Sequence, residues 1–304
     1  MRHISFELVR VTEAAAIAAS AWIGSGDKIA ADKAATEAMR DRLNQIDFVA
    51  RVAIGEGEKD KSFGLFVGEK VGRLHEAPAF YDLAVDPIDG TRPTVTSGPE
   101  AMSVIAVAEK GALFSTPEFY MDKLASSREI AEKTELSLDD PIEKTIKKVS
   151  EAAGKAAPGI MVCILDRPRH EKLIAALRRL GVRIKLIQDC DVSGAIATCL
   201  PESGIDLLAG IGGAPEGIIT ACAMKCLRGG FQARVVKKDT LAPASKIYSI
   251  DELVRGQCAF AATGVTDGSM LRGVRFTSGG PITASVFMRS ESGTVRWLTT
   301  RHGD

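Results

Sequence analysis

The sequence lacks an excess of either charge, because its 304 residues include 39 basic and 39 acidic side chains. A protein that attracts nucleic acid or an anionic membrane through its overall field carries a basic surplus, so that class is disfavoured. The chain also has no uncharged apolar run near the roughly 18 residues that a membrane-spanning helix requires. Residues 4–21 mix charged side chains among alanines, which is unlike a signal peptide. We therefore expect a cytoplasmic globular protein that has neither nucleic acid nor a membrane as a partner.

The residue types of several other functional classes are also scarce. The chain has only four histidines, and its six cysteines form no CxxC pair, so a zinc site is disfavoured. All six cysteines lie in the second half, within apolar stretches, which favours buried, reduced thiols. No GxSxG motif occurs and no cysteine stands beside a histidine, so nothing indicates covalent nucleophilic catalysis.

The periodicity of apolar residues predicts mixed secondary structure. Helical spacing covers residues 6–22 and about 27–43, and short β-branched or apolar runs predict strands further along. The predicted strands of the first half are 49–54, 65–67, 81–85 and 102–108. Residues 122–140 are polar and show no clear period. From residue 160 to 227 strands and helices alternate, which is typical of a parallel or mixed α/β layer, and residues 258–298 are strand-like again. We place a domain boundary near residue 157.

The most informative stretch is Asp86-Pro87-Ile88-Asp89-Gly90-Thr91, which follows an apolar strand. Two carboxylates that converge at a strand end repel each other unless a cation neutralises them. Oxygen ligands suit Mg²⁺ or Mn²⁺ better than zinc. The alternative is a solvated turn, since Asp-Pro and Asp-Gly are common in turns, but the whole string is too specific for that reading. The stretch therefore predicts a metal site.

Three further acids stand at comparable places. Glu56, in Gly55-Glu56-Gly57-Glu58, follows a short apolar strand, and strand ends open into one crevice in a layered α/β protein. Glu216 follows a glycine-rich turn between a strand and a helix, where backbone amides suit an anion; the turn lacks the spacing and lysine of a P-loop. Asp32 alone would indicate only a cap or a surface charge, and Glu56 alone an exposed acidic loop.

Together these segments resemble the class II (GlpX-type) fructose-1,6-bisphosphatases, which are grouped with lithium-sensitive sugar phosphatases such as inositol monophosphatase. The resemblance runs in order from about residue 6 to 290. The segments that carry it are Gly26-Asp27-Lys28 with Asp32, Ile54-Gly55-Glu56-Gly57-Glu58, Asp86–Arg92 and Gly210–Gly217. It implies an α/β (α+β) fold, a layered α/β/α/β/α sandwich of the sugar phosphatase type.

The resemblance also assigns roles to matching residues. Asp32 and Glu56 are implied as ligands of one metal, and Asp86, Asp89 and Glu216 as ligands of a second, with Mg²⁺ or Mn²⁺ at two or more positions per site. The implied substrate-binding residues are Asp89, Gly90, Thr91, Tyr120, Arg167, Pro168, Arg169, Asp189, Cys190, Asp191 and Gly213. On this basis residues 1–156 would form an N-terminal α+β domain with most metal ligands. Residues 157–304 would form a C-terminal α/β domain with the sugar-phosphate contacts.

Thr91 and Asp60 are the candidates for orienting the attacking water. Thr91 follows the turn that carries the metal ligands, and Asp60 lies four residues beyond Glu56. General-base assistance of this kind is typically worth about 10²–10⁴-fold in rate. The alternative is that Thr91 caps a helix and Asp60 is a solvated loop acid.

Three departures from the family pattern bear on function. Asp89 stands where some relatives carry glutamate, and Cys190 stands where glycine is usual, which bears on sugar discrimination. The segment 229–249 is shorter than the family leads us to expect, so a helix and its interface contacts would be missing.

We expect the enzyme to remove the 1-phosphate of fructose 1,6-bisphosphate, giving fructose 6-phosphate in gluconeogenesis. Arg167, Arg169 and His170 would form a basic pocket for the second phosphate, because arginine offers a planar fork for phosphate oxygens. That pocket makes inositol monophosphate a poor candidate substrate. The alternatives are activity on sedoheptulose 1,7-bisphosphate, alone or in addition, and a catalytically weak sugar-phosphate-binding regulatory protein. We also expect a homo-oligomer, either a dimer or a tetramer.

Overall fold

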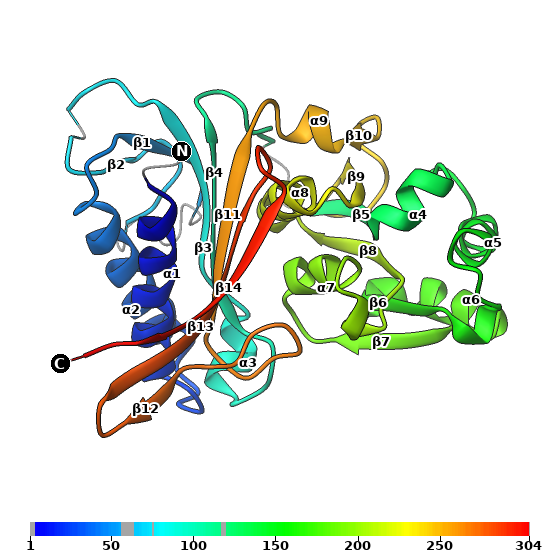
Figure 1. Ribbon diagram of the computed structural model, residues 1–304. Helices are drawn as coiled ribbons and strands as arrows, with labels where there is room; N and C mark the ends of the chain where they lie inside the picture. The colour runs from blue at the N-terminus through cyan, green and yellow to red at the C-terminus, as the bar shows by residue number, and fades with distance from the viewer. Residues whose placement is uncertain (1–3, 56–63, 75, 117–119, 304) are drawn as a thin grey trace. The chain divides into compact units, whose positions relative to one another are not determined.

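The chain divides into two compact units in the computed structural model, which describes residues 4–55, 64–74, 76–116 and 120–303. Unit 1 comprises Met1–Ser115 and Val254–Asp304, and unit 2 comprises Thr116–Leu253 (Figure 1). The chain thus leaves unit 1 once and returns to it. This division differs from the single boundary near residue 156 that the sequence predicts.

Unit 1 is built on a mixed sheet, which has eight strands in the described part of the chain. Its strands are β1 (Ala50–Ile54), β2 (Lys70–Val71), β3 (Tyr81–Asp89), β4 (Met102–Glu109), β11 (Cys258–Gly264), β12 (Arg275–Thr277), β13 (Gly280–Arg289) and β14 (Thr294–Arg301). Their order is β12-β13-β11-β4-β3-β1-β2, and β14 pairs with β13. The β1–β3 pair is parallel, whereas β4 pairs antiparallel with both β3 and β11.

Two helices, α1 (Ser5–Ser20) and α2 (Lys28–Leu43), lie side by side against this sheet (blue in Figure 1). Both are rich in alanine, the best helix former. The Asp27 side chain caps α2 by accepting a hydrogen bond from the Ala30 N–H at 3.0 Å. Leu8 and Val11 of α1 and Met39 of α2 join Val85 and Ile105 of the sheet in one buried core. The short helix α3 (Thr91–Val95) follows β3 directly.

Unit 2 contains a second mixed sheet, with six strands among its described residues in the order β10-β9-β5-β8-β6-β7. Its strands are β5 (Tyr120–Ser126), β6 (Met161–Leu165), β7 (Arg183–Ile187), β8 (Leu207–Gly213), β9 (Gly230–Val236) and β10 (Tyr248–Ser249). Its helices are α4 (Arg128–Lys133), α5 (Ile142–Ala153), α6 (Glu171–Arg179), α7 (Asp191–Ala197), α8 (Ala214–Leu227) and α9 (Ile250–Leu253). β6 runs parallel to β7 and β8, and β5 runs antiparallel to β8 and β9.

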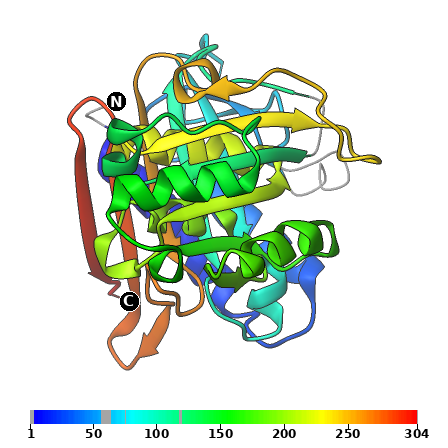
Figure 2. The ribbon, with the colours of Figure 1, turned by 90° about the vertical axis from the view of Figure 1, so that its right-hand side faces the viewer.

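Helices cover both faces of the second sheet. Val162 and Ile164 of β6 point to the face where α4, α5 and α6 supply apolar side chains, and α5 lies in front of the strands in Figure 2. Cys163, between them in sequence, points to the opposite face. There Gly194 of α7 approaches so closely that an added Cβ would lie 3.0 Å from the Cys163 sulfur. The active-site candidates of unit 2 lie at one end of this layered arrangement.

Two local expectations differ from the structure. Residues 65–67, predicted as a strand, contain only one isolated bridge residue, followed by a turn at 67–68. The antiparallel partner strand of β1 is Lys70–Val71 instead. The polar stretch that begins at residue 122 includes most of β5, a central strand of the second sheet that the sequence did not predict. The apolar pattern did not predict β5 because charged residues interrupt it, and one of them, Lys123, is buried.

The structure also tests the predicted fold class. The two mixed sheets with their covering helices confirm the α/β (α+β) class. How the layers of the two units stack stays a prediction. In the described part of the chain, no helix has the length and apolar character needed to cross a lipid bilayer. Residues 237–247 form turns between β9 and β10 and contain no helix.

Candidate active site

In unit 1, the end of β3 holds the two predicted metal ligands Asp86 and Asp89. The pairing of β3 with β4 is irregular between these two residues, where Pro87 offers no backbone donor. Asp86 Oδ1 accepts a hydrogen bond from the Ile88 N–H at 3.1 Å, and Asp89 is only 5% exposed. Gly90 follows with a φ of 99°, a conformation that glycine adopts readily. The irregularity and the turn together fix both carboxylates at the strand end.

Thr91 and Asp32 come from distant parts of the sequence and meet in unit 1. The Thr91 hydroxyl donates a hydrogen bond to Asp32 Oδ1 at 2.7 Å. Asp32 lies in the second turn of α2, and Thr91 is the first residue of α3. The N-cap residue of α3 is Gly90, so Thr91 does not occupy the capping position that the alternative assigned to it. Asp32 therefore lies beside the turn that carries Asp89.

Glu56 and Asp60, the other predicted residues of this region, lie outside the described residues. The end of β1 that leads to them is described. An added Cβ on Gly55 would lie 2.2 Å from the Leu65 carbonyl oxygen, so only glycine fits there. Gly55 is therefore required by local packing, independently of any role of Glu56.

In unit 2, the predicted substrate residues gather at one edge of the second sheet. Arg167 and Asp189 lie in the loops after the parallel strands β6 and β7, and Glu216 lies in the first turn of α8, directly after β8. β5 is antiparallel to β8, and Tyr120 at its start pairs with Gly213 at the end of β8. Residues after the carboxyl ends of parallel strands share one crevice, which is the usual ligand position in such sheets.

The two arginines of this edge are held by neighbouring groups. Arg167 forms an ion pair with Asp189. Arg169 donates from Nε to the Ile211 carbonyl at 2.9 Å, and its guanidinium carbon lies 5.1 Å from the centre of the Tyr120 ring. That distance is within the range of a cation–π contact. Pro168 begins the single 3₁₀ turn between the arginines and fixes the backbone there. Each guanidinium has five N–H donors, so both retain donors for an anion.

His170 has a structural position rather than a place in the basic pocket. Its Nδ1–H donates to the Leu165 carbonyl at 2.7 Å, and its Nε2 accepts from the Ile211 N–H at 2.8 Å. This pattern requires the neutral ring, and burial lowers the pKa of His170. His170 thus ties the end of β6 to β8 and contributes no positive charge to the basic pocket.

Lys123, which the sequence analysis missed, neutralises acidic groups at the same edge. Its ammonium group lies 2.7 Å from Asp191 Oδ2, and the residue is only 1% exposed. An added Cβ on Gly212 would lie 1.9 Å from Asp191 Oδ2 and 3.0 Å from Lys123 Nζ. Gly212 is therefore required for this buried ion pair to fit. The available signal was an Asp-Lys pair flanked by the apolar Met121 and Leu124 in an unassigned stretch.

Glu216 lies in the first turn of α8, and its carboxylate lies close to the backbone of Gly213. An added Cβ on Gly213 would lie 1.8 Å from Glu216 Oε2. That oxygen is buried and has no hydrogen-bond partner among the described residues. Burial raises the pKa of Glu216, Lys123 lowers it, and Asp191 raises it further. A buried carboxylate oxygen without a protein donor fits a cation ligand.

Cys190, where the family usually has glycine, has a φ of 66°. This left-handed conformation costs an L-residue with a Cβ roughly 1–2 kcal/mol, a cost that glycine avoids. Cys190 immediately precedes α7 and is 3% exposed. A glycine at this position would adopt the same backbone conformation without that cost, an explanation that the sequence alone did not provide.

The sequence model of a protein family, described as bacterial fructose-1,6-bisphosphatase, glpX-encoded, matches this chain over residues 2–302. The chain belongs to this family. The match confirms the resemblance that the motifs indicated, and with it membership of a family of metal-dependent phosphoric monoester hydrolases of carbohydrate metabolism.

Curated relatives match the chain nearly end to end. A "D-fructose 1,6-bisphosphatase class 2/sedoheptulose 1,7-bisphosphatase" of Synechococcus sp. (strain JA-3-3Ab) is 38% identical, over 98% of this chain and 95% of the relative. A protein of the same name from Synechocystis sp. (strain ATCC 27184 / PCC 6803 / Kazusa) is also 38% identical, over 98% of this chain and 96% of the relative. The alignments span 333 and 332 residues, more than the 304 of this chain, so the relatives contain segments that this glpX-type chain lacks.

Among solved structures, an inositol monophosphatase from Anabaena (Nostoc) sp. PCC 7120 matches with a TM-score of 0.32 and 14% sequence identity. The match covers 66% of this chain and 71% of that one.

The described metal-ligand candidates of this glpX-type chain come from both units. Asp32, Asp86 and Asp89 belong to unit 1, and Glu216 belongs to unit 2. Among the residues that the structure describes, no three His, Cys, Asp or Glu side chains form a ready metal-binding cluster. The donor set consists of carboxylates only, which fits Mg²⁺ or Mn²⁺ rather than zinc.

Proposed function

We propose that the protein hydrolyses the 1-phosphate of fructose 1,6-bisphosphate to fructose 6-phosphate and phosphate. The observation that carries this proposal is the family match over residues 2–302, together with relatives of the same activity that align over 98% of the chain. The basic pocket at the edge of the second sheet supports a substrate with two phosphates. A catalytically weak binding protein would not need the acidic residues that are present.

Asp32, Glu56, Asp86, Asp89 and Glu216 would hold the metal ions. The buried, unpartnered Oε2 of Glu216 supports this role for one of them. Two bound divalent cations, Mg²⁺ or Mn²⁺, would supply Lewis-acid activation and charge neutralisation for attack on the phosphate dianion. The carboxylates would otherwise repel the substrate, so metal occupancy is a condition for binding it.

Thr91 and Asp60 would orient the attacking water. The Thr91 hydroxyl donates its proton to Asp32, so its oxygen lone pairs are free to accept a hydrogen bond from water. Asp60 is the proposed acceptor of the proton that the water loses. Asp89, Gly90 and Thr91 would contact the phosphate that is cleaved.

The second phosphate would bind to Arg167 and Arg169. The contact of Arg169 with the Tyr120 ring and with the Ile211 carbonyl holds its guanidinium in place before substrate arrives, which lowers the entropy cost of binding. The sugar hydroxyls would contact the proposed loop that consists of Asp189, Cys190 and Asp191, along with Gly213. Lys123 would keep Asp191 in position.

A second candidate function is hydrolysis of sedoheptulose 1,7-bisphosphate by the same site. The observation that favours it is the name of the two cyanobacterial relatives, which includes both activities. The two substrates differ by one carbon in the sugar, so the same two phosphate subsites would serve both.

The proposed setting is the cytoplasm, and the proposed assembly is a homo-oligomer, either a dimer or a tetramer. All six cysteines are free thiols, which is the usual state in a reducing compartment.

A phosphate-release assay with Mg²⁺ or Mn²⁺ and a substrate panel tests the function. We expect turnover of fructose 1,6-bisphosphate, alone or together with sedoheptulose 1,7-bisphosphate, and little turnover of inositol monophosphate. Saturable binding of either bisphosphate with no phosphate release would support the regulatory alternative and contradict the enzyme. A preference for inositol monophosphate would contradict the proposed second phosphate pocket.

A further inference from the structure

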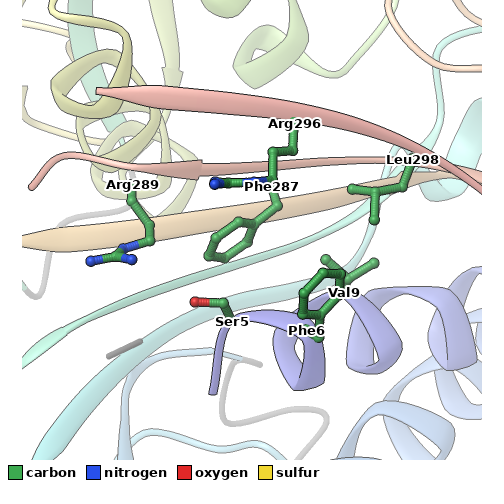
Figure 3. Close-up of a pocket in the computed structure, with 7 residues that line it drawn as sticks. All are labelled: Ser5, Phe6, Val9, Phe287, Arg289, Arg296 and Leu298. Carbon is green, nitrogen blue, oxygen red and sulfur yellow. The ribbon is translucent and has the colours of Figure 1, made fainter. Parts of the chain in front are cut away.

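A cavity of about 200 Å³ lies within unit 1, between the first two turns of α1 and the sheet (Figure 3). Its lining residues are Ser5, Phe6, Val9, Phe287, Arg289, Arg296 and Leu298. The two phenylalanines, Val9 and Leu298 provide apolar walls, and the arginines and Ser5 provide polar groups. No residue proposed for metal or substrate binding is among them, so the cavity is a separate feature of the protein.

Strand geometry explains why both arginines point toward this cavity. Residues two apart on a strand share a face, so Phe287 and Arg289 of β13 point the same way. Arg296 of β14 is the direct partner of Phe287 in the β13–β14 register, and directly opposed residues also share a face. The face that meets the start of α1 therefore combines apolar side chains with two guanidinium groups.

The described residues of the cavity lining include two cationic side chains, Arg289 and Arg296, and no acidic one. Arg289 has a side chain only 14% exposed, and it forms an ion pair with Glu291, which is not among the lining residues. Arg296 donates to the Thr294 hydroxyl at 2.9 Å, a neutral partner. In Figure 3 the Arg289 guanidinium lies on the side of the Ser5 hydroxyl, and the Arg296 side chain extends alongside Phe287. Both guanidinium groups therefore have their present partners outside the lining, and each still has N–H donors for an anion in the cavity.

We propose that this cavity binds a small organic anion with one phosphate, phosphonate or carboxylate group and an apolar body about the size of one ring. The anionic group would accept hydrogen bonds from Arg289 and Arg296, which retain donors after their present contacts. The ring would pack against Phe287 and Leu298. The volume lies below the about 300–1,000 Å³ of pockets for drug-sized ligands, which limits the ligand to fragment size.

Phenylphosphonate tests the proposal, because it carries both parts and is not cleaved by a phosphate-ester hydrolase. Titration calorimetry is done on the full chain in excess EDTA, so that the proposed metal site does not hold the anion, and is repeated on Arg169→Ala, which removes the proposed second phosphate pocket and should leave this binding unchanged. We expect saturable binding with one ligand per chain. Arg289→Gln and Arg296→Gln should each weaken it at least about 10-fold, whereas Arg301→Gln, on the same strand but outside the lining, should leave it unchanged.

Methylphosphonate tests the apolar part of the ligand, and we expect it to bind at least about 10-fold more weakly than phenylphosphonate. Equal binding of the two phosphonates would overturn the proposed ligand class. No saturable binding, or wild-type binding by both arginine variants, would overturn the site itself. If Arg289→Gln fails to fold, the exposed Arg296 alone decides the matter. Phosphate release by Arg296→Gln should match the wild type, so failure of this site is distinguishable from failure of the proposed function.

Discussion

The Lys123 ammonium lies 2.7 Å from Asp191 Oδ2, and both side chains are buried at the edge of the second sheet. Asp191 is the first residue of α7, whereas Lys123 lies in β5, so the ion pair joins a helix to a strand. Lys123 also lowers the pKa of Glu216, which places its charge within range of a second carboxylate. The Lys123 ammonium thus offsets the negative charge of Asp191, a proposed sugar contact, and of Glu216, a proposed metal ligand.

Replacing Lys123 by methionine should destabilise the protein strongly. The variant leaves Asp191 buried without its counter-charge, and breaking a buried pair costs about 3–5 kcal/mol. Urea denaturation of the metal-free protein measures the change in the free energy of unfolding.

The double variant Lys123→Met/Asp191→Leu provides the control. It replaces both charges by apolar groups, so it should be more stable than Lys123→Met alone. If Lys123→Met is as stable as the wild type, the ion pair contributes nothing to the fold.

Thr91→Val should reduce kcat by at least one order of magnitude. The substitution removes the hydroxyl that donates to Asp32 and would orient water, but it keeps the shape of the side chain. KM, metal affinity and melting temperature should change little. Steady-state kinetics and a thermal melt measure these quantities.

Thr96→Val is the matched control, because the exposed Thr96 hydroxyl donates only to the Arg92 carbonyl. Thr91→Ser should retain most of the activity, since it keeps the hydroxyl. A Thr91→Val enzyme with normal kcat and a lowered melting temperature would assign Thr91 a purely structural role.

Removing divalent metal should abolish phosphate release, and adding Mg²⁺ or Mn²⁺ should restore it. Metal should also stabilise the fold, because a ligand at 100 times its Kd raises the free energy of unfolding by about 2.7 kcal/mol. Glu216→Gln should reduce that stabilisation. Full turnover in excess EDTA, with metal content verified as absent, would contradict the proposed metal-dependent mechanism.

Arg169→Ala should raise the KM for fructose 1,6-bisphosphate far more than that for a simple sugar monophosphate. A contact with the uncleaved phosphate exists in both the ground and the transition state, so its loss acts mainly on KM. Kinetics on both substrates measure the difference. Arg178→Ala, an exposed position on α6, serves as the control. Equal losses on both substrates would move Arg169 out of the second phosphate pocket.

Cys190→Gly should be more stable than Cys190→Ala by about 1–2 kcal/mol, because only glycine adopts a φ of 66° without a steric penalty. Both variants remove the thiol, so the comparison isolates the backbone conformation. Guanidinium denaturation of the two variants measures it. If Cys190→Ala is the more stable of the two, backbone strain does not explain the family preference for glycine.

The parts of the site that depend on local sequence were predictable. Asp86 and Asp89 follow a strand and flank a proline, and their short spacing places both at the strand end whatever the rest of the chain does. The meeting of Asp32 with Thr91 depends on the packing of α2 against α3, which only the resemblance implied. Lys123 was missed because a buried lysine interrupts the apolar pattern that identifies a strand.

The division into two units was not predictable from local patterns, because sheet order depends on long-range pairing. The alternation of strands and helices after residue 160 suggested that one domain continues to the end of the chain. Instead β11 pairs with β4 along its whole length, from Cys258 opposite Ala108 to Gly264 opposite Met102. Strands far apart in sequence thus lie side by side in one sheet.

This return of the chain has a consequence for synthesis on the ribosome. The Leu113–Val254 bridge joins the points where the chain leaves unit 1 and re-enters it, so all of unit 2 is inserted between two neighbouring strands. Unit 2 is continuous in sequence and is complete before β11 to β14 have been translated. Until β11 has been translated, β4 lacks its partner strand on one edge, and an unpaired strand edge is prone to aggregation. Translation speed through unit 2 would therefore set how long the nascent chain is exposed to misassembly.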